Sequence, residues 1–299
     1  MNQPARFRSL LVPIDLTPSS DRVLGRLSLL PLADHARVTI LHVISAGLPP
    51  AVERRAKRDA DKALGEEVRH LRKSLPRNVT VQPLVKLGSV AKEISACAAK
   101  VKAELIVMGR GGGRALRDVF LGSTAERVIR RGQRPVLVVR LPPRAAYRRP
   151  VLALERDQAA HEIVRLMLLV LPPPRPRVTI IHAYDFPYGG LTYPSLSHAD
   201  AGQTKKELQV NATLKLASLV GAALARQHAS PEDAPPWETY VRYGAPRTVV
   251  EKAIRETESD LLLLGTRGYA GAAYVLLGTV AGDLLRQVKC DVLVVPPAP

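Results

Sequence analysis

The sequence has few of the residues that build disulfide scaffolds, metal clusters or membrane spans. Only two of its 299 residues are cysteines, Cys97 and Cys290, and they are far apart and in no C-x-x-C motif. This scarcity argues against a disulfide framework and against a cysteine-based zinc site. No uninterrupted apolar run is long enough to cross a bilayer, and the N-terminus lacks the apolar core of a signal peptide. We therefore expect a cytoplasmic protein without a transmembrane segment.

Acidic residues are scarce in the first half of the chain. Residues 1–149 hold 29 Lys and Arg against 12 Asp and Glu, whereas residues 150–299 hold 15 of each, so the net charge of +17 belongs to the first half. Aromatic residues make up only 4% of the chain, which offers few stacking partners for bases among these cations. We interpret the charge as a solvated basic surface. Binding of nucleic acid, an anionic surface or an acidic protein is the less favoured alternative.

No catalytic or metal-ligating set can be assembled from the spacing. His42 and His182 occupy equivalent places in two apolar runs, and we interpret them as structural histidines hydrogen-bonded near strand ends. There is no recognisable Ser-His-Asp set, no pair of carboxylates and no cluster of metal ligands. We predict no catalytic residue and no metal site of the protein's own.

The sequence does contain a glycine-rich motif twice, with 156 residues between equivalent positions. MGRGGGRALRDVFLGST (108–124) and GTRGYAGAAYVLLGTV (265–280) each follow a short apolar run and share the pattern G-x-x-G-x9-G-[ST]. The glycines of the two copies are Gly109, Gly112, Gly122 and Gly265, Gly268, Gly278. The spacing matches neither a P-loop nor the G-x-G-x-x-G dinucleotide fingerprint, although glycines between a strand and a helix are typical of phosphate binding.

Short β-branched runs alternate with longer amphipathic stretches in both copies. In copy one, residues 1–141, we expect strands near 9–14, 37–44, 79–85, 104–109 and 135–140, and helices near 18–32, 51–75, 89–102 and 122–132. This alternation predicts an α/β fold in which each copy forms an open parallel sheet with helices on both faces.

Copy two, residues 150–299, follows the linker LPPRAAYRRP (141–150). The offset between the copies grows from 140 to 156, which indicates an insertion within 184–236. The insertion begins with four aromatic residues that either pack their own loop or cover a ligand. They are Tyr184, Phe186, Tyr188 and Tyr193.

The two motifs, the opening LLVPIDLTPSS, and the runs VTILHV and VLVV resemble the universal stress protein family in its tandem form. The resemblance covers nearly the whole chain. It implies two tandem five-stranded parallel sheets of order 3-2-1-4-5 and a stress-response regulator that binds ATP, with or without Mg²⁺. Such a protein would act on a protein partner, not identifiable from sequence, through its nucleotide-dependent conformation. The alternatives are a nucleotide-free interaction protein that uses the basic half, or a weak ATPase or other nucleotide-using enzyme.

The resemblance also assigns the nucleotide contacts. Asp15 and Val43 would hold adenine and ribose, while the glycines and the start of the following helix would hold the phosphates. The carboxyl ends of the first and fourth strands also border the crevice where open α/β sheets bind ligands. The expected set in copy one is Pro13, Asp15, Val43, Met108, Gly109, Arg110, Gly112, Gly122, Ser123 and Thr124. The expected set in copy two is Glu155, Ala183, Gly265, Gly268, Gly278, Thr279 and Val280.

Two further expectations concern the relation between the copies. Glu155 replaces Asp15 and is one methylene longer, and copy one has three loop arginines (Arg110, Arg114, Arg117), so copy one should bind more tightly. The VLVV runs at 136–139 and 292–295 would each be an apolar edge strand, and such edges seek pairing. We expect the copies to pair through them, as in a family homodimer, and leave open a homodimer of whole chains.

Overall fold

A computed structural model of the protein describes residues 6–111, 122–132, 134–154, 159–184, 198–227, 234–266 and 278–296. The strands are β1 (Phe7–Pro13), β2 (Leu32–Ser45), β3 (Thr80–Gly88), β4 (Leu105–Gly109), β5 (Val136–Val139), β6 (Pro150–Ala153), β7 (Val178–Tyr184), β8 (Trp237–Tyr243), β9 (Leu261–Gly265) and β10 (Asp291–Val295). The helices are α1 (Ser20–Leu27), α2 (Pro50–Leu71), α3 (Val90–Lys100), α4 (Ser123–Arg130), α5 (Ala159–Val170), α6 (His198–Arg226), α7 (Pro246–Glu256) and α8 (Thr279–Gln287).

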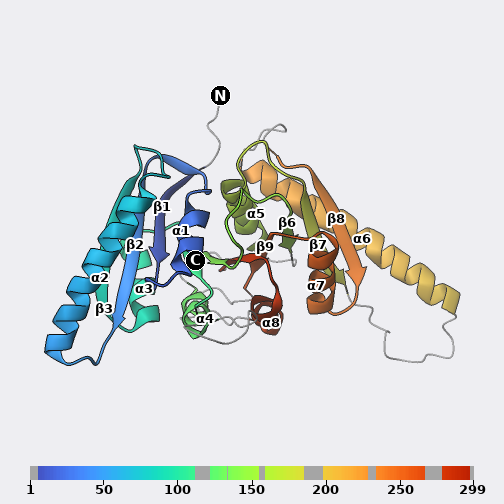
Figure 1. Ribbon diagram of the computed structural model, residues 1–299. Coiled ribbons are helices and arrows are strands. Elements are labelled where there is room, and N and C mark those ends of the chain that lie inside the picture. Colours follow the sequence, from blue (N-terminus) through green and yellow to red (C-terminus); the bar gives the residue numbers. More distant parts are fainter. Residues whose placement is uncertain are drawn as a thin grey trace.

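All the strands belong to one ten-stranded sheet of order β3-β2-β1-β4-β5-β10-β9-β6-β7-β8 (Figure 1). Within each copy the strands are parallel and follow the expected order 3-2-1-4-5. The expectation of two sheets is corrected in one respect, because β5 and β10 join them into one. They pair antiparallel, with Leu137 opposite Leu293 and Val138 opposite Val292. The predicted pairing of the VLVV strands is therefore confirmed.

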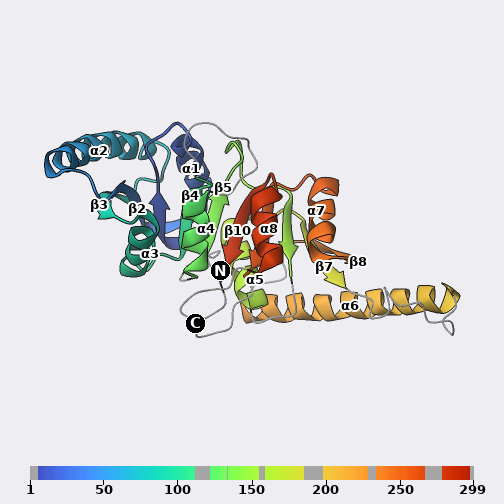
Figure 2. The same cartoon turned by 90° about the horizontal axis from the view of Figure 1, so that it is seen from below.

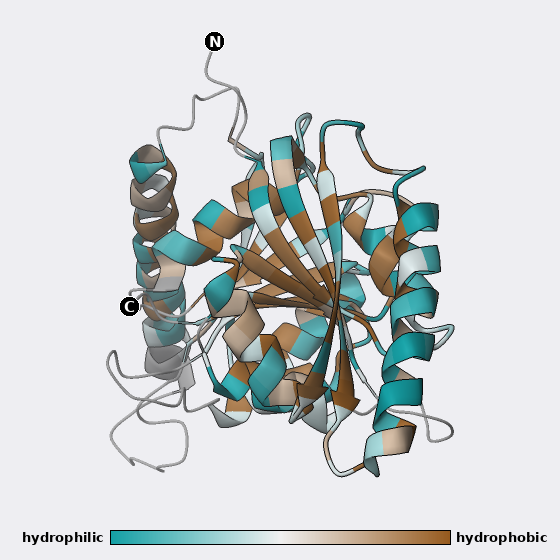
Figure 3. Ribbon diagram, turned by 90° about the vertical axis from the view of Figure 1, so that its left-hand side faces the viewer, coloured by the Kyte–Doolittle hydropathy of each residue, from teal (hydrophilic) through white to brown (hydrophobic). Residues whose placement is uncertain are grey.

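Helices cover both faces of this sheet, as predicted. One buried cluster joins the sheet to α1, α2, α5 and α6, and a second joins the opposite face to α3, α4, α7 and α8. Neighbouring residues of a strand belong to different clusters: Leu10 lies in the first and Leu11 in the second. Because both faces are buried, the strands are apolar along their length, which Figure 3 shows as a hydrophobic fan between hydrophilic outer helix faces.

The largest differences from the expected boundaries lie between the first helix and the second strand. The first helix ends at Leu27 instead of near residue 32, and β2 begins at Leu32 instead of near residue 37. Leu32 pairs with Phe7 at the start of β1, and a bulge separates this pair from the regular register. Local pattern could not predict this pairing, because the partner strand supplies the hydrogen bonds that make 32–36 extended.

The helix of the insertion, α6, is 29 residues long, whereas its counterpart α2 has 22. One side of α6 is buried through Leu216, Val220 and Ala223, and its N-terminal half extends beyond β8 (Figures 1 and 2). By length and composition alone, Gly202–Arg226 is apolar enough to cross a membrane. A single helix that packs on the sheet in this way is weak evidence for a span.

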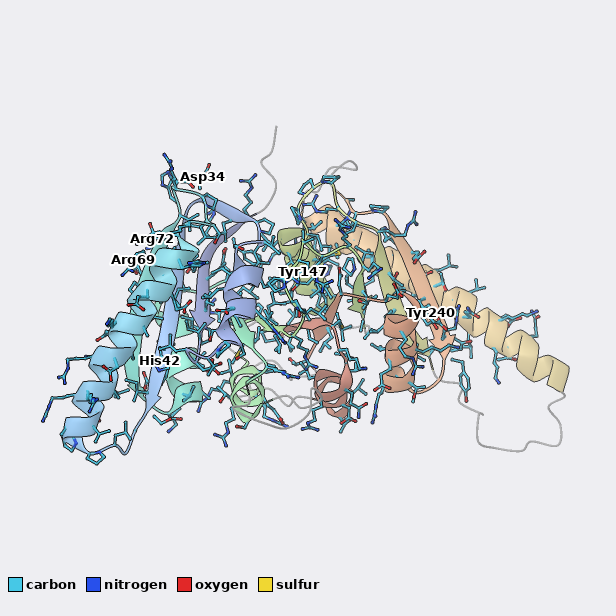
Figure 4. All side chains as sticks on the ribbon, viewed as in Figure 1. Asp34, His42, Arg69, Arg72, Tyr147 and Tyr240 are labelled. Carbon is cyan, nitrogen blue, oxygen red and sulfur yellow. The ribbon has the colours of Figure 1, made fainter. Side chains whose placement is uncertain are left out.

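A buried polar cluster joins the copies beside β5 and β10. Asp291 is fully buried, and its Oδ1 accepts the backbone N–H groups of Arg140 (2.7 Å) and Leu141 (2.8 Å). Its Oδ2 accepts the hydroxyl of Tyr147 at 2.7 Å and forms an ion pair with Arg26 at 3.2 Å. The Arg26 guanidinium also stacks on the Tyr147 ring, 4.1 Å from its centroid. Figure 4 shows Tyr147 between the two halves, so this cluster fixes the linker against both copies.

Both cysteines should be unreactive in the folded protein. Burial raises the pKa of Cys97, and burial together with the charge of Asp291 raises the pKa of Cys290 to about 12. A thiol whose pKa is raised stays protonated near neutral pH, and the protonated form is a poor nucleophile. We expect a thiol-specific disulfide reagent at pH 8 to label neither cysteine in the native protein and both in concentrated urea. A rapidly labelled thiol in the native protein would contradict this burial.

Candidate functional site

The carboxyl ends of β2, β1 and β4 bring several predicted site residues to one edge of the sheet. The parallel registers place Val43, Asp15 and Arg110 side by side, one on each strand or just after it. Pro13 and Met108 lie level with each other two residues earlier, and both are buried. Neighbouring strands are about 4.8 Å apart, so Asp15 lies between the other two at the distance of a single strand. The prediction that these residues share one edge of the sheet agrees with this placement, while their role in binding stays a prediction.

Asp15 is exposed, and its carboxylate organises the turn after β1. Oδ1 accepts hydrogen bonds from the Thr17 hydroxyl at 2.7 Å, the Thr17 N–H at 3.2 Å and the Ser20 hydroxyl at 3.0 Å. Partial burial acts to raise the pKa of Asp15, but these hydrogen bonds outweigh it and the pKa is lowered. The carboxylate therefore stays ionised at neutral pH. Among the described residues no hydrogen bond reaches Oδ2, which leaves one oxygen that can accept from a ligand.

The two ends of the glycine-rich segment meet where β4 stops and α4 begins. The N–H of Gly122 donates to the carbonyl of Arg110 at 2.7 Å, and Gly111 has φ +69°, a conformation that favours glycine. A Cβ on Gly122 would lie 2.6 Å from the Arg110 oxygen and 2.7 Å from the Gly111 carbonyl. Only glycine fits there without a shift of the backbone. This explains the third glycine of the motif, and we call this close approach of the end of β4 to the start of α4 the cradle.

Helix α4 starts directly after this cradle. Gly122 is its N-cap and has no side chain to cap it, so the N–H groups of Ser123, Thr124 and the next residue lack an intrahelical acceptor. Ser123 is exposed and Thr124 is half-buried. Free N–H groups and the helix dipole at such an end favour an anion. A phosphate group is the kind of ligand that this arrangement fits.

The same arrangement recurs in copy two. Gly265 ends β9, Gly278 is the N-cap of α8, and Thr279 and Val280 form the first turn of that helix. Ala183 lies near the end of β7 and is half-buried. Thr266 takes the place of Arg110, but it is buried and its N–H donates to Val295 at 3.0 Å. Copy two therefore has the glycines and the helix start, and it lacks an arginine of its own at this level.

Some predicted residues lie outside the described part of the chain. They are Gly112, Arg114, Arg117, Glu155 and Gly268, together with the aromatic residues Phe186, Tyr188 and Tyr193. Tyr184 is described. Its ring packs against Tyr243 with centroids 6.1 Å apart, and its hydroxyl donates to the Lys205 carbonyl at 3.2 Å. This aromatic residue thus attaches α6 to the edge of the sheet.

The two repeated histidines have the structural role that we predicted. His42 Nδ1 lies 3.0 Å from the Ile14 carbonyl, and His182 Nδ1 lies 3.0 Å from the Leu154 carbonyl (His42 is labelled in Figure 4). Each ring ties the second strand of its copy to the residue just after the first strand. Among the described residues, no group of three or more His, Cys, Asp and Glu side chains is placed to hold a metal ion.

A model of the universal stress protein family matches the chain twice, over residues 6–140 and 146–296. The chain belongs to the universal stress protein family. Its two matches cover both halves, so it is a tandem member, and the resemblance noted in the sequence is confirmed.

Individual relatives match over shorter segments. Universal stress protein MJ0531 of Methanocaldococcus jannaschii is 53% identical over 55 residues, which are 18% of this chain and 32% of that protein. The universal stress protein E homolog of Haemophilus influenzae is 35% identical over 60 residues, which are 20% of this chain and 19% of that protein. The chain thus matches about a third of one of these relatives and about a fifth of the other.

Solved structures show the same tandem fold over the whole chain. A universal stress protein from Archaeoglobus fulgidus superposes with a TM-score of 0.69 at 16% identity, covering 99% of this chain and 100% of that one. A Pseudomonas aeruginosa protein of unknown function has a TM-score of 0.61 at 15% identity, covering 97% of this chain and 93% of that one. At such identities the likeness concerns the fold alone.

Proposed function

We propose that this universal stress protein is a cytoplasmic ATP-binding regulator whose two domains are copy one and copy two. The cradle at Gly122 is the observation that carries the proposal, because only glycine fits there and it brings the free N–H groups at the start of α4 to the end of β4. Asp15 and Val43 would contact the ribose and adenine, and Met108, Gly109 and Arg110 would border the phosphates. Many members of this family bind ATP, a subgroup that lacks the glycine motif does not, and this chain keeps the motif twice.

A Mg²⁺ ion, where present, would be held mainly by the phosphate oxygens. The described residues supply no carboxylate cluster that could hold it, and Asp15 is occupied on one oxygen by its own turn. The regulatory step in this proposal is a shift between conformations: a nucleotide that spans β1 and β4 favours one arrangement of the residues that follow β4. A protein partner would recognise that arrangement.

Mass spectrometry of nucleotide released from the purified protein tests the proposal directly. Co-purified ATP, or calorimetric binding of added ATP, supports it. Protein that neither carries nor binds a nucleotide would instead support the alternative of an interaction protein that uses its basic half.

Asp15→Asn is expected to lower the affinity of copy one for ATP about tenfold, or about 1.4 kcal/mol. The amide keeps an oxygen for Thr17 and Ser20 but replaces the acceptor at Oδ2 by a donor. Because the pKa of Asp15 is lowered, its carboxylate is fully ionised from pH 5 to pH 8, and this group should add no pH dependence to binding in that range. Titration calorimetry measures both effects.

Asp21→Asn is the matched control. Asp21 is an exposed acid on the first turn of α1, six residues further along the chain, and it is not placed at the strand ends. An equal loss of ATP affinity in the two variants would show that only net charge matters. It would contradict the proposed contact between Asp15 and the nucleotide.

A further inference from the structure

The antiparallel junction places one arginine of copy one at the candidate site of copy two. Val136 of β5 pairs with Val294 of β10, which pairs with Leu264 of β9. β5 runs opposite to β9 and β10. The residue two positions before Val136 is therefore level with the residue two positions after Leu264. Arg134 is therefore level with Thr266, just past the end of β9 and two strand spacings away, or roughly 10 Å.

The packing of α4 against α8 also places Arg134 at the candidate site of copy two. Glu126, in the first turn of α4, contacts Arg286, in the last turn of α8, at 3.2 Å. Figures 1 and 2 show α4 and α8 side by side. Their opposite directions bring the end of α4, and the short connection that contains Arg134, next to the start of α8 at Thr279.

A comparison of equivalent positions shows what this arginine replaces. The residues 156 positions after Arg110 and Arg134 are Thr266 and Cys290. At the end of β4, copy one has its own Arg110. The residue of copy two that lies at the same level is Cys290, which is buried and neutral. At the end of β9, copy two has the buried Thr266, and the residue of copy one that lies at the same level is Arg134. Copy one also has Arg140 beside Arg110 at this level, but the Arg140 guanidinium donates to the carbonyls of Leu285 and Val288. Arg134 is thus the arginine that copy one places at the level of Thr266 in copy two.

Arg134 is suitably held for such a role. The next residue, Pro135, accepts the Ile106 N–H on its carbonyl at 2.9 Å, and Gly132, two residues before Arg134, donates its N–H to the Ile129 carbonyl at 2.9 Å. The side chain is half-buried, and it has no ion pair or hydrogen bond in the part of the chain that the structure describes. A half-buried guanidinium without an anionic partner is well matched to phosphate oxygens, which it can contact through two parallel N–H groups.

We propose that Arg134 of copy one binds the phosphates of a nucleotide held in copy two, so that the second site is built from both copies. This inference rests on the proposed ATP binding. It names Arg134 as the residue that completes the candidate site of copy two. It also gives a functional reason for the fixed antiparallel junction, because only a correctly paired sheet brings Arg134 to Gly265 and Gly278.

The test measures copy two alone by placing Gly122→Ala in every protein, which disables the cradle of copy one. In this background Arg134→Gln is expected to weaken ATP binding at least tenfold in titration calorimetry at low salt. Adenosine, which has no phosphates, should bind equally well with or without Arg134→Gln. Arg134→Lys should recover part of the ATP affinity because it restores the charge without the planar fork.

Arg127→Gln is the matched control, since Arg127 is an exposed arginine of α4 whose removal changes the net charge equally. An equal loss from Arg127→Gln and Arg134→Gln would overturn the proposed contact in favour of a general field effect. Unchanged ATP affinity in Arg134→Gln, or no ATP binding by copy two in the Gly122→Ala background, would also overturn it. Failure of the proposed function itself differs, because the unmodified protein would then bind no ATP at all.

Discussion

Replacing Asp291 by alanine should lower the free energy of unfolding by about 3–5 kcal/mol, the usual cost of removing one partner from a buried ion pair. The substitution leaves Arg26, which is 3% exposed, as a buried charge without its carboxylate. It also removes the acceptor of the Tyr147 hydroxyl and of two backbone N–H groups. Urea unfolding monitored by circular dichroism measures the loss, with the slope compared between variants to check that both unfold in the same way.

Asp283→Ala provides the control for this large effect. Asp283 lies on α8 of the same copy, and its ion pairs within the described part of the chain are exposed ones, at 3.6 Å to Arg247 and to Arg286. Such pairs contribute about 0–1 kcal/mol. Adding Arg26→Met to Asp291→Ala should recover part of the lost stability, because it removes the uncompensated charge. Similar losses from Asp291→Ala and Asp283→Ala would show that the cluster does not hold the copies together.

The contrast between β5–β10 and the Asp291 cluster shows what the sequence could predict. The repeated VLVV run was enough to predict that the two edges pair, since four consecutive apolar residues on an edge need a covering partner. Asp291 gave no such signal. In sequence it is one charged residue next to Lys289 and Cys290, and its partners come from α1 and the linker, more than 140 residues away. Its equivalent in copy one is Pro135, so even the repeat does not indicate the cluster.

The candidate site also contains residues that the sequence could predict and one that it could not. Motif spacing, together with the strand order implied by the family resemblance, sufficed to place Asp15, Val43 and Arg110 on one edge, because parallel strands bring their carboxyl ends together. The position of Arg134 could not be predicted. It depends on the antiparallel register between β5 and β10, and shifting that register by two residues would move Arg134 by one full side-chain repeat along the sheet. Pattern can predict that two edges pair, but side-chain packing decides the register.

This arrangement changes the expected difference between the two sites. The sequence favoured tighter binding by copy one, from Asp15 and the three loop arginines. Arg134 supplies copy two with a cation that its own sequence lacks at Thr266. We therefore expect a smaller difference in ATP affinity between the copies than their separate sequences indicate, as long as the junction is intact.

Gly122→Ala is expected to lower the ATP affinity of copy one at least a hundredfold, or about 2.7 kcal/mol. The added methyl group would lie 2.6 Å from the Arg110 carbonyl and 2.7 Å from that of Gly111, both of them backbone atoms that cannot rotate away. Relief of this contact must separate the end of β4 from the start of α4 and break the 2.7 Å hydrogen bond between Gly122 and Arg110. The N–H groups of the first turn of α4 would then no longer point at the place where β4 ends, and phosphate oxygens would lose donors that were fixed in advance.

Two measurements separate this loss from general damage to the fold. Gly65→Ala, in an open position of α2, should leave ATP binding unchanged and raise helix stability slightly, because alanine favours helix over glycine. In Gly122→Ala itself, calorimetry should lose one binding event and keep the other, because Gly278 of copy two is untouched and the buried faces of α4, Ala125, Val128 and Ile129, are unchanged. Two binding events of unchanged affinity in Gly122→Ala would show that the phosphates do not lie in this cradle.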